Sequence, residues 1–185
     1  MNDPVQPDDI IDFWFSAKVK NNWFSSNERF DQEIRARFQD IYNDAREGAY
    51  LQWRDTPRGA LALVLLFDQF PRNMFRGVAE AFATDDLALE IARETITAGQ
   101  DRQLSDDERG FLYMPYMHSE DLAVQNVGLR LYGELGHKER LDFMWRHHAI
   151  ISQFGRYPHR NAVLGRQSTD EELAFLLTPE SRFSL

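Results

Sequence analysis

The chain has 185 residues, of which 43% are hydrophobic and 28% are charged, a composition typical of a globular protein. Its 30 acidic and 21 basic side chains give a net charge of −9, which argues against nucleic acid or an anionic membrane as a partner. It contains no cysteine, so disulfides, cysteine-ligated zinc, iron–sulfur clusters and thiol catalysis are excluded. A chain of this length buries roughly 70% of its surface on folding, and we expect one all-helical domain over residues 1–185.

The N-terminal stretch Met1–Asp9 is polar and acidic. It has neither the basic start nor the apolar core of a secretory signal, so we expect a cytoplasmic protein. The longest apolar run is Ala60–Phe67, which is much shorter than the roughly 20 residues that span a membrane. We therefore interpret this run as a buried helix segment and expect no membrane partner.

Helix start and stop signals recur from one end of the chain to the other. The predicted helices cover Pro7–Phe15, Ser25–Gly48, Pro57–Phe70, Thr84–Gly99, a segment beginning at Ser105, Ser119–Gly136, Lys138–Gly155 and a segment beginning at Ser168. The Ser-x-x-Glu spacing of a capping box occurs at Ser25, Ser105 and Ser168. No stretch alternates in the manner of a strand, so the fold is predicted to be all-α, with about eight to ten helices joined by short loops.

Two segments that follow strongly apolar helices are similar to one another. Asp68–Asn73 reads DQFPRN and Gln153–Asn161 reads QFGRYPHRN, so both contain Gln-Phe, then a proline, then Arg-Asn. A similarity this short arises either by chance or by internal duplication.

These two segments and three others carry a resemblance to a known family. In chain order the five are Ile11–Phe15, Asp68–Asn73, Ala81–Asp85, His118–Leu122 and Phe154–Asn161. Over nearly its whole length the chain resembles the bacterial domain-of-unknown-function family 924, which is described as TPR-like and all-helical. The resemblance implies a right-handed stack of antiparallel helix hairpins. It implies no activity and no catalytic residue.

Polar groups that break an apolar pattern mark candidate functional positions. Asp68 comes at the end of the apolar helix, where a carboxylate faces the negative end of the helix dipole. If it is buried it needs a cationic partner, for which Arg72 or an arginine of the second segment is the natural candidate. Two interpretations stay open: a structural ion pair that locks the Phe70–Pro71 turn, or one wall of a pocket.

The arginines of the two similar segments are candidate ligand-binding residues. An arginine after a helix end can bond the unpaired carbonyls there, and this accounts for each arginine separately. It does not explain why Asn and His side chains occur beside these arginines. If the two segments meet in space, their guanidinium groups form a basic concavity suited to a carboxylate or a phosphate. The candidate binding residues of these segments are Asp68, Arg72, Asn73, Arg156, Arg160 and Asn161.

His118 precedes a helix start that bears Glu120 and Asp121. A histidine–carboxylate pair at this place would hold the imidazole in one tautomer as a general base, whereas the simpler interpretation is that the acids complement the helix dipole. His118 and His159 are the candidate catalytic residues, and Glu120 and Asp121 join the candidate binding residues.

Neither a cofactor nor a metal is predicted. The sequence lacks the glycine-rich dinucleotide and phosphate loops, the H-E-x-x-H metal helix, the G-x-S-x-G elbow and EF-hand spacing. His147 and His148 are neighbours on one helix and point about 100° apart, so they cannot grip one metal ion together. We interpret both as hydrogen-bonded core residues.

Three functions are consistent with these patterns. The first is a cytoplasmic helical protein with a pocket for a small anionic molecule, which acts as an enzyme if His118 or His159 is an acid or base. The second is a TPR-like module that binds a peptide. In the third, the polar motifs only staple the fold. The pocket is favoured because the unusual residues cluster at turns, and a symmetric homodimer is the common default for oligomeric state.

Overall fold

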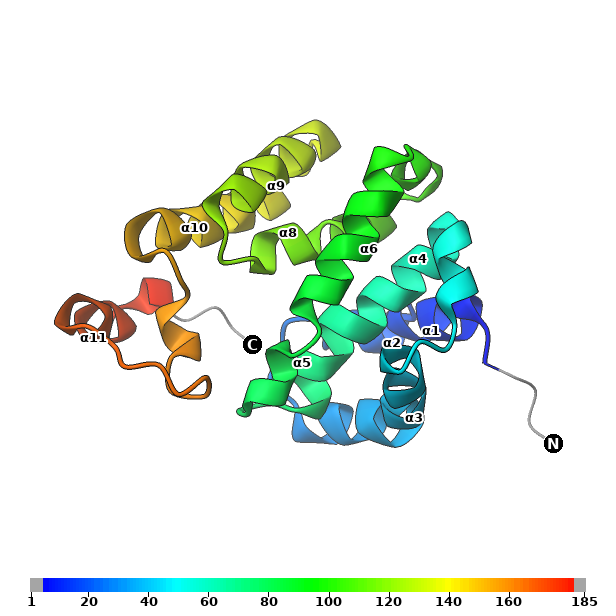
Figure 1. The fold of residues 1–185 in the computed structure, drawn as a ribbon, viewed down its shortest axis with the longest axis horizontal. Coiled ribbons are helices and arrows are strands. Elements are labelled where there is room, and N and C mark those ends of the chain that lie inside the picture. The colour runs from blue at the N-terminus through cyan, green and yellow to red at the C-terminus, as the bar shows by residue number, and fades with distance from the viewer. Residues whose placement is uncertain (1–4, 182–185) are drawn as a thin grey trace.

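A computed structural model describes residues 5–181, so the first four residues of the polar N-terminal stretch lie outside the described part. Within residues 5–181 every regular element is helical, which confirms the all-α prediction. The longer helices are α1 (Pro7–Trp14), α3 (Glu28–Arg46), α4 (Pro57–Val64), α6 (Asp85–Thr97), α9 (Leu122–Leu135) and α10 (Lys138–Phe154) (Figure 1). The shorter ones are α2 (Ala17–Lys20), α5 (Phe70–Met74), α7 (Asp106–Leu112), α8 (Met114–His118) and α11 (Asp170–Leu176).

Several helices are joined by short 3-10 turns. These turns are Leu51–Asp55, Ala79–Phe82, Gln100–Gln103, Pro158–Arg160 and Pro179–Ser181. Helices α4 and α5 are two parts of one bent helix, and α7 and α8 meet at Tyr113; with each of these pairs counted once, the described residues hold nine helices, as expected. No helix among the described residues has the length and apolar character needed to cross a bilayer. The TPR-like stacking stays a prediction.

Helix α4 lies at the centre of the main core. The run Ala60–Phe67 is buried on every side, as its sequence predicts. In Figure 1 α4 lies between α1 and α6, and it contacts both of them. Gly59 allows the first turn of α4 to approach the preceding 3-10 turn, because a Cβ at this position would come 2.1 Å from the carbonyl oxygen of Trp53.

Of the three helix starts predicted from capping boxes, one is confirmed and two begin one or two residues later. Ser105 and Glu108 form the predicted capping box of α7. The predicted starts at Ser25 and Ser168 are wrong by one or two residues: Asn27 caps α3, and Thr169 caps α11. Each of these stretches contains several side chains able to cap a helix, so the burial of the apolar face decides which one does.

The predicted turn at Phe70–Pro71 is also wrong, because the helix continues through Pro71 to the end of α5. Proline lacks an N–H, and in an α-helix its ring clashes with the carbonyl four residues earlier. A π-helical turn at Leu65–Gln69 widens the helix just before the proline. The carbonyl of Phe67, which Pro71 cannot bond, accepts a 2.6 Å hydrogen bond from the Thr84 hydroxyl instead. Asp68 lies within this widened turn.

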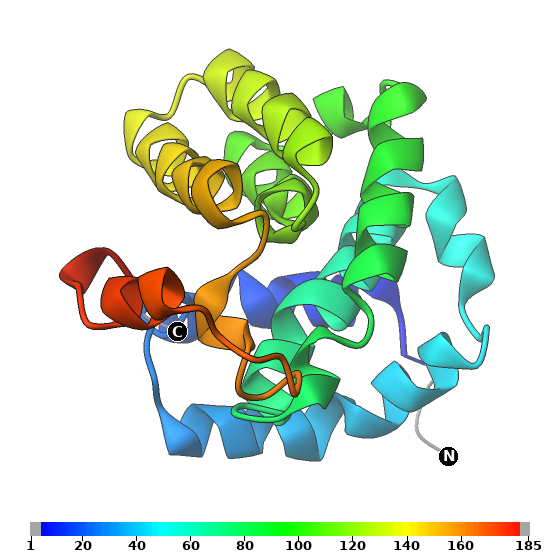
Figure 2. The ribbon, with the colours of Figure 1, turned by 60° about the vertical axis from the view of Figure 1, so that its left-hand side comes forward.

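Helices α9 and α10 form an antiparallel pair that packs over α8 (Figure 1). Helix α10 ends at Gly155, whose φ of 68° is the left-handed conformation that glycine adopts readily. The chain then continues as a C-terminal segment, residues 155–181, which Figure 2 shows as a separate layer beside α10. Its buried apolar contacts are few and belong to a small cluster of their own, around Ile150, Ile151 and Tyr157. Polar contacts must therefore supply much of its attachment.

Candidate functional site

A fully buried carboxylate lies at the centre of the candidate site. Asp68 is 0% exposed, and its Oδ1 lies 2.6 Å from Nδ1 of His118 and 3.3 Å from Nη1 of Arg72. The amide of Gln69 donates a hydrogen bond to Oδ2. A buried carboxylate needs such partners because its charge has lost the solvation of water. Arg72 is thus the cationic partner that the sequence predicts, and His118 is a second partner.

Two arginines and a second carboxylate extend this arrangement. Arg72 forks onto Asp85 with hydrogen bonds of 2.9 and 3.0 Å. Arg160, which comes from the C-terminal segment, donates to the backbone carbonyl of His118 at 3.0 Å and lies 3.4 Å from Asp85 Oδ2. Its guanidinium carbon lies 4.6 Å from the ring centres of both Phe82 and Tyr157, so the group makes cation–π contacts with two aromatic rings.

We call these five residues the Asp68 cluster: Asp68, Arg72, Asp85, His118 and Arg160. They come from four of the five segments that carry the family resemblance. Helices α5, α6 and α8 each supply at least one of them, and the C-terminal segment supplies Arg160.

The protonation states follow from burial and the neighbouring charges. Burial acts to raise the pKa of Asp68, but Arg72 and His118 outweigh it and hold that pKa below its usual range. Burial and the charge of Arg72 lower the pKa of His118, against the opposing pull of Asp68. At neutral pH the carboxylate is therefore ionised and the imidazole neutral. The proton between them belongs to Nδ1, which leaves the lone pair on Nε2.

The imidazole of His118 is oriented by a carboxylate other than the ones predicted. The prediction that Glu120 or Asp121 pairs with His118 is wrong, because the imidazole bonds Asp68 instead. Among the described residues no hydrogen bond to Nε2 of His118 is found, and the side chain is 12% exposed. A neutral histidine with a fixed Nδ1 proton and an Nε2 lone pair that no described residue bonds is the arrangement of a general base.

The two arginines of the cluster are unequally neutralised. Although burial opposes it, Asp68 and Asp85 raise the pKa of Arg72. Burial and the neighbouring Arg72 lower the pKa of Arg160. The Nε of Arg160 is buried without a hydrogen-bond partner among the described residues. Positive charge at Arg160 is therefore compensated incompletely.

A second polar network, which we call the C-terminal clamp, consists of Glu120, Arg156, Asn161, Arg166 and Glu172. Arg156 forks onto Glu172 at 2.6 and 2.8 Å, and Asn161 donates to the same carboxylate at 3.2 Å. Arg166 forks onto Glu120 at 2.6 and 3.0 Å. Through these bonds the predicted binding residues Glu120, Arg156 and Asn161 hold the C-terminal segment in place.

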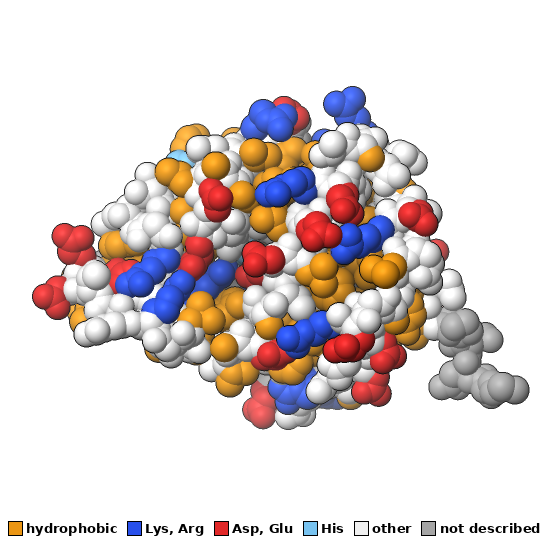
Figure 3. Space-filling model, in the orientation of Figure 1, with side chains coloured by type: hydrophobic (Ala, Val, Ile, Leu, Met, Phe, Trp, Pro, Cys, Tyr) orange, Lys and Arg blue, Asp and Glu red, His pale blue; other side chains and the backbone are white. Residues whose placement is uncertain are grey.

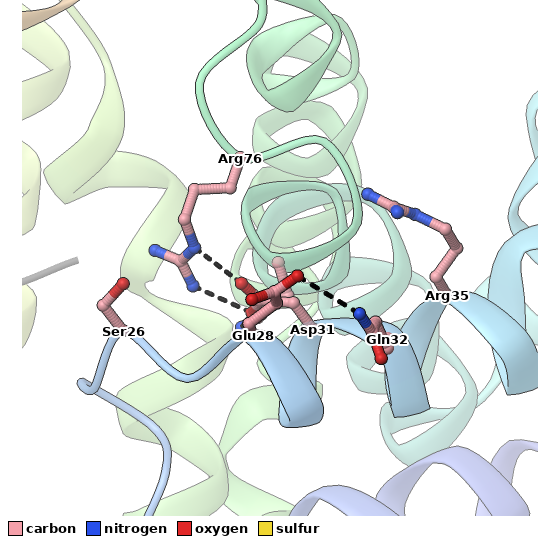
Figure 4. A pocket seen from close by; sticks show the side chains of 7 residues that line it. Ser26, Glu28, Asp31, Gln32, Arg35 and Arg76 are labelled. Carbon is pink, nitrogen blue, oxygen red and sulfur yellow. Dashed lines mark hydrogen bonds and ion pairs between the residues drawn. The ribbon is translucent and has the colours of Figure 1, made fainter.

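The other predicted binding residues also have structural partners. The amide of Asn73 donates to Asp31 at 2.8 Å, and Arg76 forks onto the same carboxylate. These groups line a surface hollow of about 260 Å³ (Figure 4). Asp121 caps α9 by accepting hydrogen bonds from the first backbone N–H groups of that helix.

The imidazole rings of His147 and His159 both lie near the Tyr157 ring, with ring centres 5.8 and 5.4 Å from it. His147 is also 6.3 Å from His118. Burial lowers the pKa of His147 to about 3, and burial together with Arg160 lowers the pKa of His159 to about 4. Within residues 5–181 no three His, Asp or Glu side chains are placed to hold a metal ion.

Sequence reasoning missed two residues that shape this site. Asp85 is absent from the candidate residues, although it accepts hydrogen bonds from both arginines of the cluster. Gln125 is 0% exposed, and its amide donates to the carbonyls of Met117 and Ser119 at 2.7 and 2.8 Å, on both sides of His118. The available signal for Gln125 is an amide within the apolar stretch that begins α9.

The family model of a bacterial protein of unknown function (DUF924) matches residues 10–180. The chain belongs to this family. A solved structure of a protein of unknown function from Agrobacterium tumefaciens, 40% identical in sequence, superposes with a TM-score of 0.88 over 92% of this chain and 96% of that one. No curated protein matches the chain. In this member of the family the fold brings four of the five family-like segments together at the Asp68 cluster.

Figure 3 shows how charged side chains are distributed over one face of this family member. Basic side chains gather toward the end of the molecule that carries the C-terminal segment, and acidic side chains lie between them. The three arginines expected to form a basic concavity all contact carboxylates: Arg72 and Arg160 contact Asp85, and Arg156 contacts Glu172. The charges at this end are therefore largely paired, with Arg160 the least compensated of the three.

Proposed function

We propose that the protein binds a small anionic molecule at the Asp68 cluster and transfers a proton from it or from a bound water. His118 is the general base in this proposal, and Arg160 is the partner of the anion. The observation that carries the proposal is the 2.6 Å bond between Nδ1 of His118 and the fully buried carboxylate of Asp68.

The dyad supports base chemistry for two reasons. A buried, ionised carboxylate fixes the imidazole in one orientation and stabilises the imidazolium that forms when Nε2 takes a proton. The lowered pKa of His118 keeps the resting imidazole neutral and able to accept that proton. Arg72 and Arg160 lie beside the dyad, where positive charge stabilises negative charge that develops during a reaction.

A peptide-binding module is the second candidate. Its support is that Phe143 and Trp145 on α10 are 50% and 53% exposed, and aromatic rings on a helical surface suit peptide contacts. This candidate leaves the buried Asp68–His118 dyad without a role, so we favour proton transfer.

The test is imidazole NMR of ¹⁵N-histidine-labelled protein at constant pH and ionic strength. Acetate, propionate, inorganic phosphate and sulfate are each titrated against chloride as the reference ion. We expect His118 to show the Nδ1-protonated tautomer and to shift saturably with at least one ion. His148, which bonds Asn126 at 2.9 Å, is the control in the same sample and should stay unchanged.

Variants at Arg160 separate binding from bulk ionic effects. Arg160→Gln should abolish the ion response and Arg160→Lys should weaken it, while both keep the His118 tautomer that Asp68 fixes. The proposal fails if no ion shifts His118, or if Arg160→Gln responds in the same way as the unmodified protein. It also fails if His118 carries its proton on Nε2.

A further inference from the structure

We infer that the anion taken by the Asp68 cluster is a carboxylate with a single negative charge, rather than a phosphate or sulfate dianion. This inference rests on the proposed function and specifies its ligand class. Three features of the cluster support it: the sum of its charges, the backbone N–H groups nearby that already have acceptors, and the planar guanidinium of Arg160, the less compensated of its two arginines.

The fixed charges of the cluster cancel. Arg72 and Arg160 are positive, Asp68 and Asp85 are negative, and His118 is neutral when at rest. The next pair outward, Glu120 with Arg166, also cancels. A monoanion therefore adds one uncompensated charge to the site, whereas a dianion adds two in surroundings where charges are weakly screened.

The backbone donors that usually recognise phosphate are already occupied here. Phosphate sites commonly use free N–H groups at a helix N-terminus. At the start of α9, next to His118, the carboxylate of Asp121 accepts the N–H groups of Ala123 and Val124. The N–H of Tyr157 donates to Glu120 at 2.8 Å. A phosphate that used these backbone donors would have to displace both Asp121 and Glu120, whereas a ligand that binds only Arg160 displaces the single 3.4 Å contact with Asp85.

Arg160 has the geometry that suits a planar carboxylate. Its guanidinium carbon lies 4.6 Å from the ring centres of both Phe82 and Tyr157, so cation–π contacts hold the group in place, and a guanidinium donates its hydrogen bonds in its own plane. The contact with Asp85 at 3.4 Å is longer than either bond from Arg72 to that residue. A ligand carboxylate can therefore replace this weaker contact without breaking the Arg72–Asp85 fork.

The limited exposure of the cluster also favours a small ligand. The side chains of His118 and Asp85 are 12% and 18% exposed, and that of Arg160 is 8% exposed. Only a narrow part of the cluster reaches the surface. A short carboxylate can present its head group there while the remainder of the molecule stays outside.

The experiment compares three ions on the full chain, by the His118 NMR shift and by thermal stability. Propionate is a monoanion, sulfate is a dianion, and inorganic phosphate changes from mostly one to mostly two negative charges between about pH 6 and about pH 8. We expect propionate to bind at both pH values, and at least about tenfold more tightly than sulfate. Phosphate should weaken as the pH rises, while propionate changes little.

Asp85→Asn tests the charge argument directly, because it leaves the cluster with one surplus positive charge. We expect sulfate to gain affinity in this variant by about tenfold relative to propionate. Glu172→Gln changes the net charge of the protein by the same amount within the clamp, and sulfate should gain nothing from it. If Asp85→Asn fails to fold, the ion series on the unmodified protein still decides.

The outcomes separate the two proposals. Binding of sulfate, or of phosphate at about pH 8, as tight as that of propionate overturns the monoanion inference and leaves the proposed function standing. An equal gain for sulfate in Asp85→Asn and Glu172→Gln also overturns it, since bulk charge would then explain the effect. No response of His118 to any ion overturns both.

Discussion

The Asp68 cluster and the C-terminal clamp use the same residue types in different ways. In the clamp each carboxylate is forked by one arginine and also takes a backbone N–H: Glu172 with Arg156, and Glu120 with Arg166. In the cluster two arginines share one carboxylate, a second carboxylate is held jointly by Arg72 and His118, and one buried donor has no partner. Polar groups that are fully satisfied indicate a structural role, whereas buried groups left short of partners indicate a site.

The largest expected effect comes from removing the central charge of the cluster. Asp68→Asn leaves Arg72 and the Nδ1–H of His118 without their buried anion, and we expect the free energy of unfolding to fall by about 3–5 kcal/mol. Urea-induced unfolding followed by circular dichroism measures this loss. Glu172→Gln is the matched control from the clamp: Glu172 is also buried, but its partner Arg156 is 29% exposed and keeps contact with water, so this variant should cost less. Equal losses in the two variants would remove the distinction between the two regions.

Much of the fold could be predicted from the sequence, because helix periodicity and capping act over a few residues. The buried run Ala60–Phe67 and the capping box at Ser105 are read directly from such local patterns. The continuation of the helix through Pro71 could not be predicted in this way. It depends on Thr84, 13 residues further along the chain, which bonds the carbonyl that the proline leaves free.

The sequence predicts most residues of the candidate site, but it does not predict which carboxylate bonds His118. The sequence singled out Asp68, Arg72, His118 and Arg160, which the structure brings together. It paired His118 with the acids beside it in the chain, because only local neighbours are visible in a sequence. The true partner, Asp68, is 50 residues away and is positioned by packing of α8 against the rest of the core.

An intermediate effect is expected when acid lowers the stability of the folded protein. It tests His147 and His159, whose rings lie near Tyr157, the residue that contacts both regions. An ordinary histidine has a pKa of about 6.5 in an unfolded chain. Burial lowers the pKa of folded His147 to about 3 and that of His159, with help from Arg160, to about 4. As pH falls below about 6.5, the unfolded chain therefore binds protons that the folded protein does not, and stability decreases.

His147→Gln and His159→Gln should each make this acid dependence shallower, by up to about one proton. The effect of His147→Gln should extend to a lower pH, because its folded pKa is the lower of the two. Thermal unfolding midpoints measured between about pH 7 and about pH 4 give the slopes. Unchanged slopes in both variants would show that these rings are protonated in the folded protein without cost.

The smallest expected effect concerns Tyr157, the residue that belongs to both regions. Its backbone N–H and carbonyl bond Glu120 and Arg166 of the clamp. Its hydroxyl donates to the carbonyl of Met117 at 2.5 Å and accepts from Gln125, next to His118. Tyr157→Phe removes only the hydroxyl, and we expect a loss of about 1 kcal/mol in the free energy of unfolding.

Tyr132→Phe is the matched control, because the Tyr132 hydroxyl makes a comparable buried bond of 2.7 Å to the carbonyl of Gly110, remote from the dyad. The losses of stability in urea should lie within about 1 kcal/mol of each other, since Tyr157→Phe removes two buried hydrogen bonds and Tyr132→Phe removes one. Only Tyr157→Phe should shift the imidazole NMR signals of His118, because its hydroxyl fixes the residue that precedes this histidine. If both variants leave His118 unchanged, the clamp attaches the C-terminal segment without positioning the base, and Arg160 becomes the one link between the two regions that bears on function.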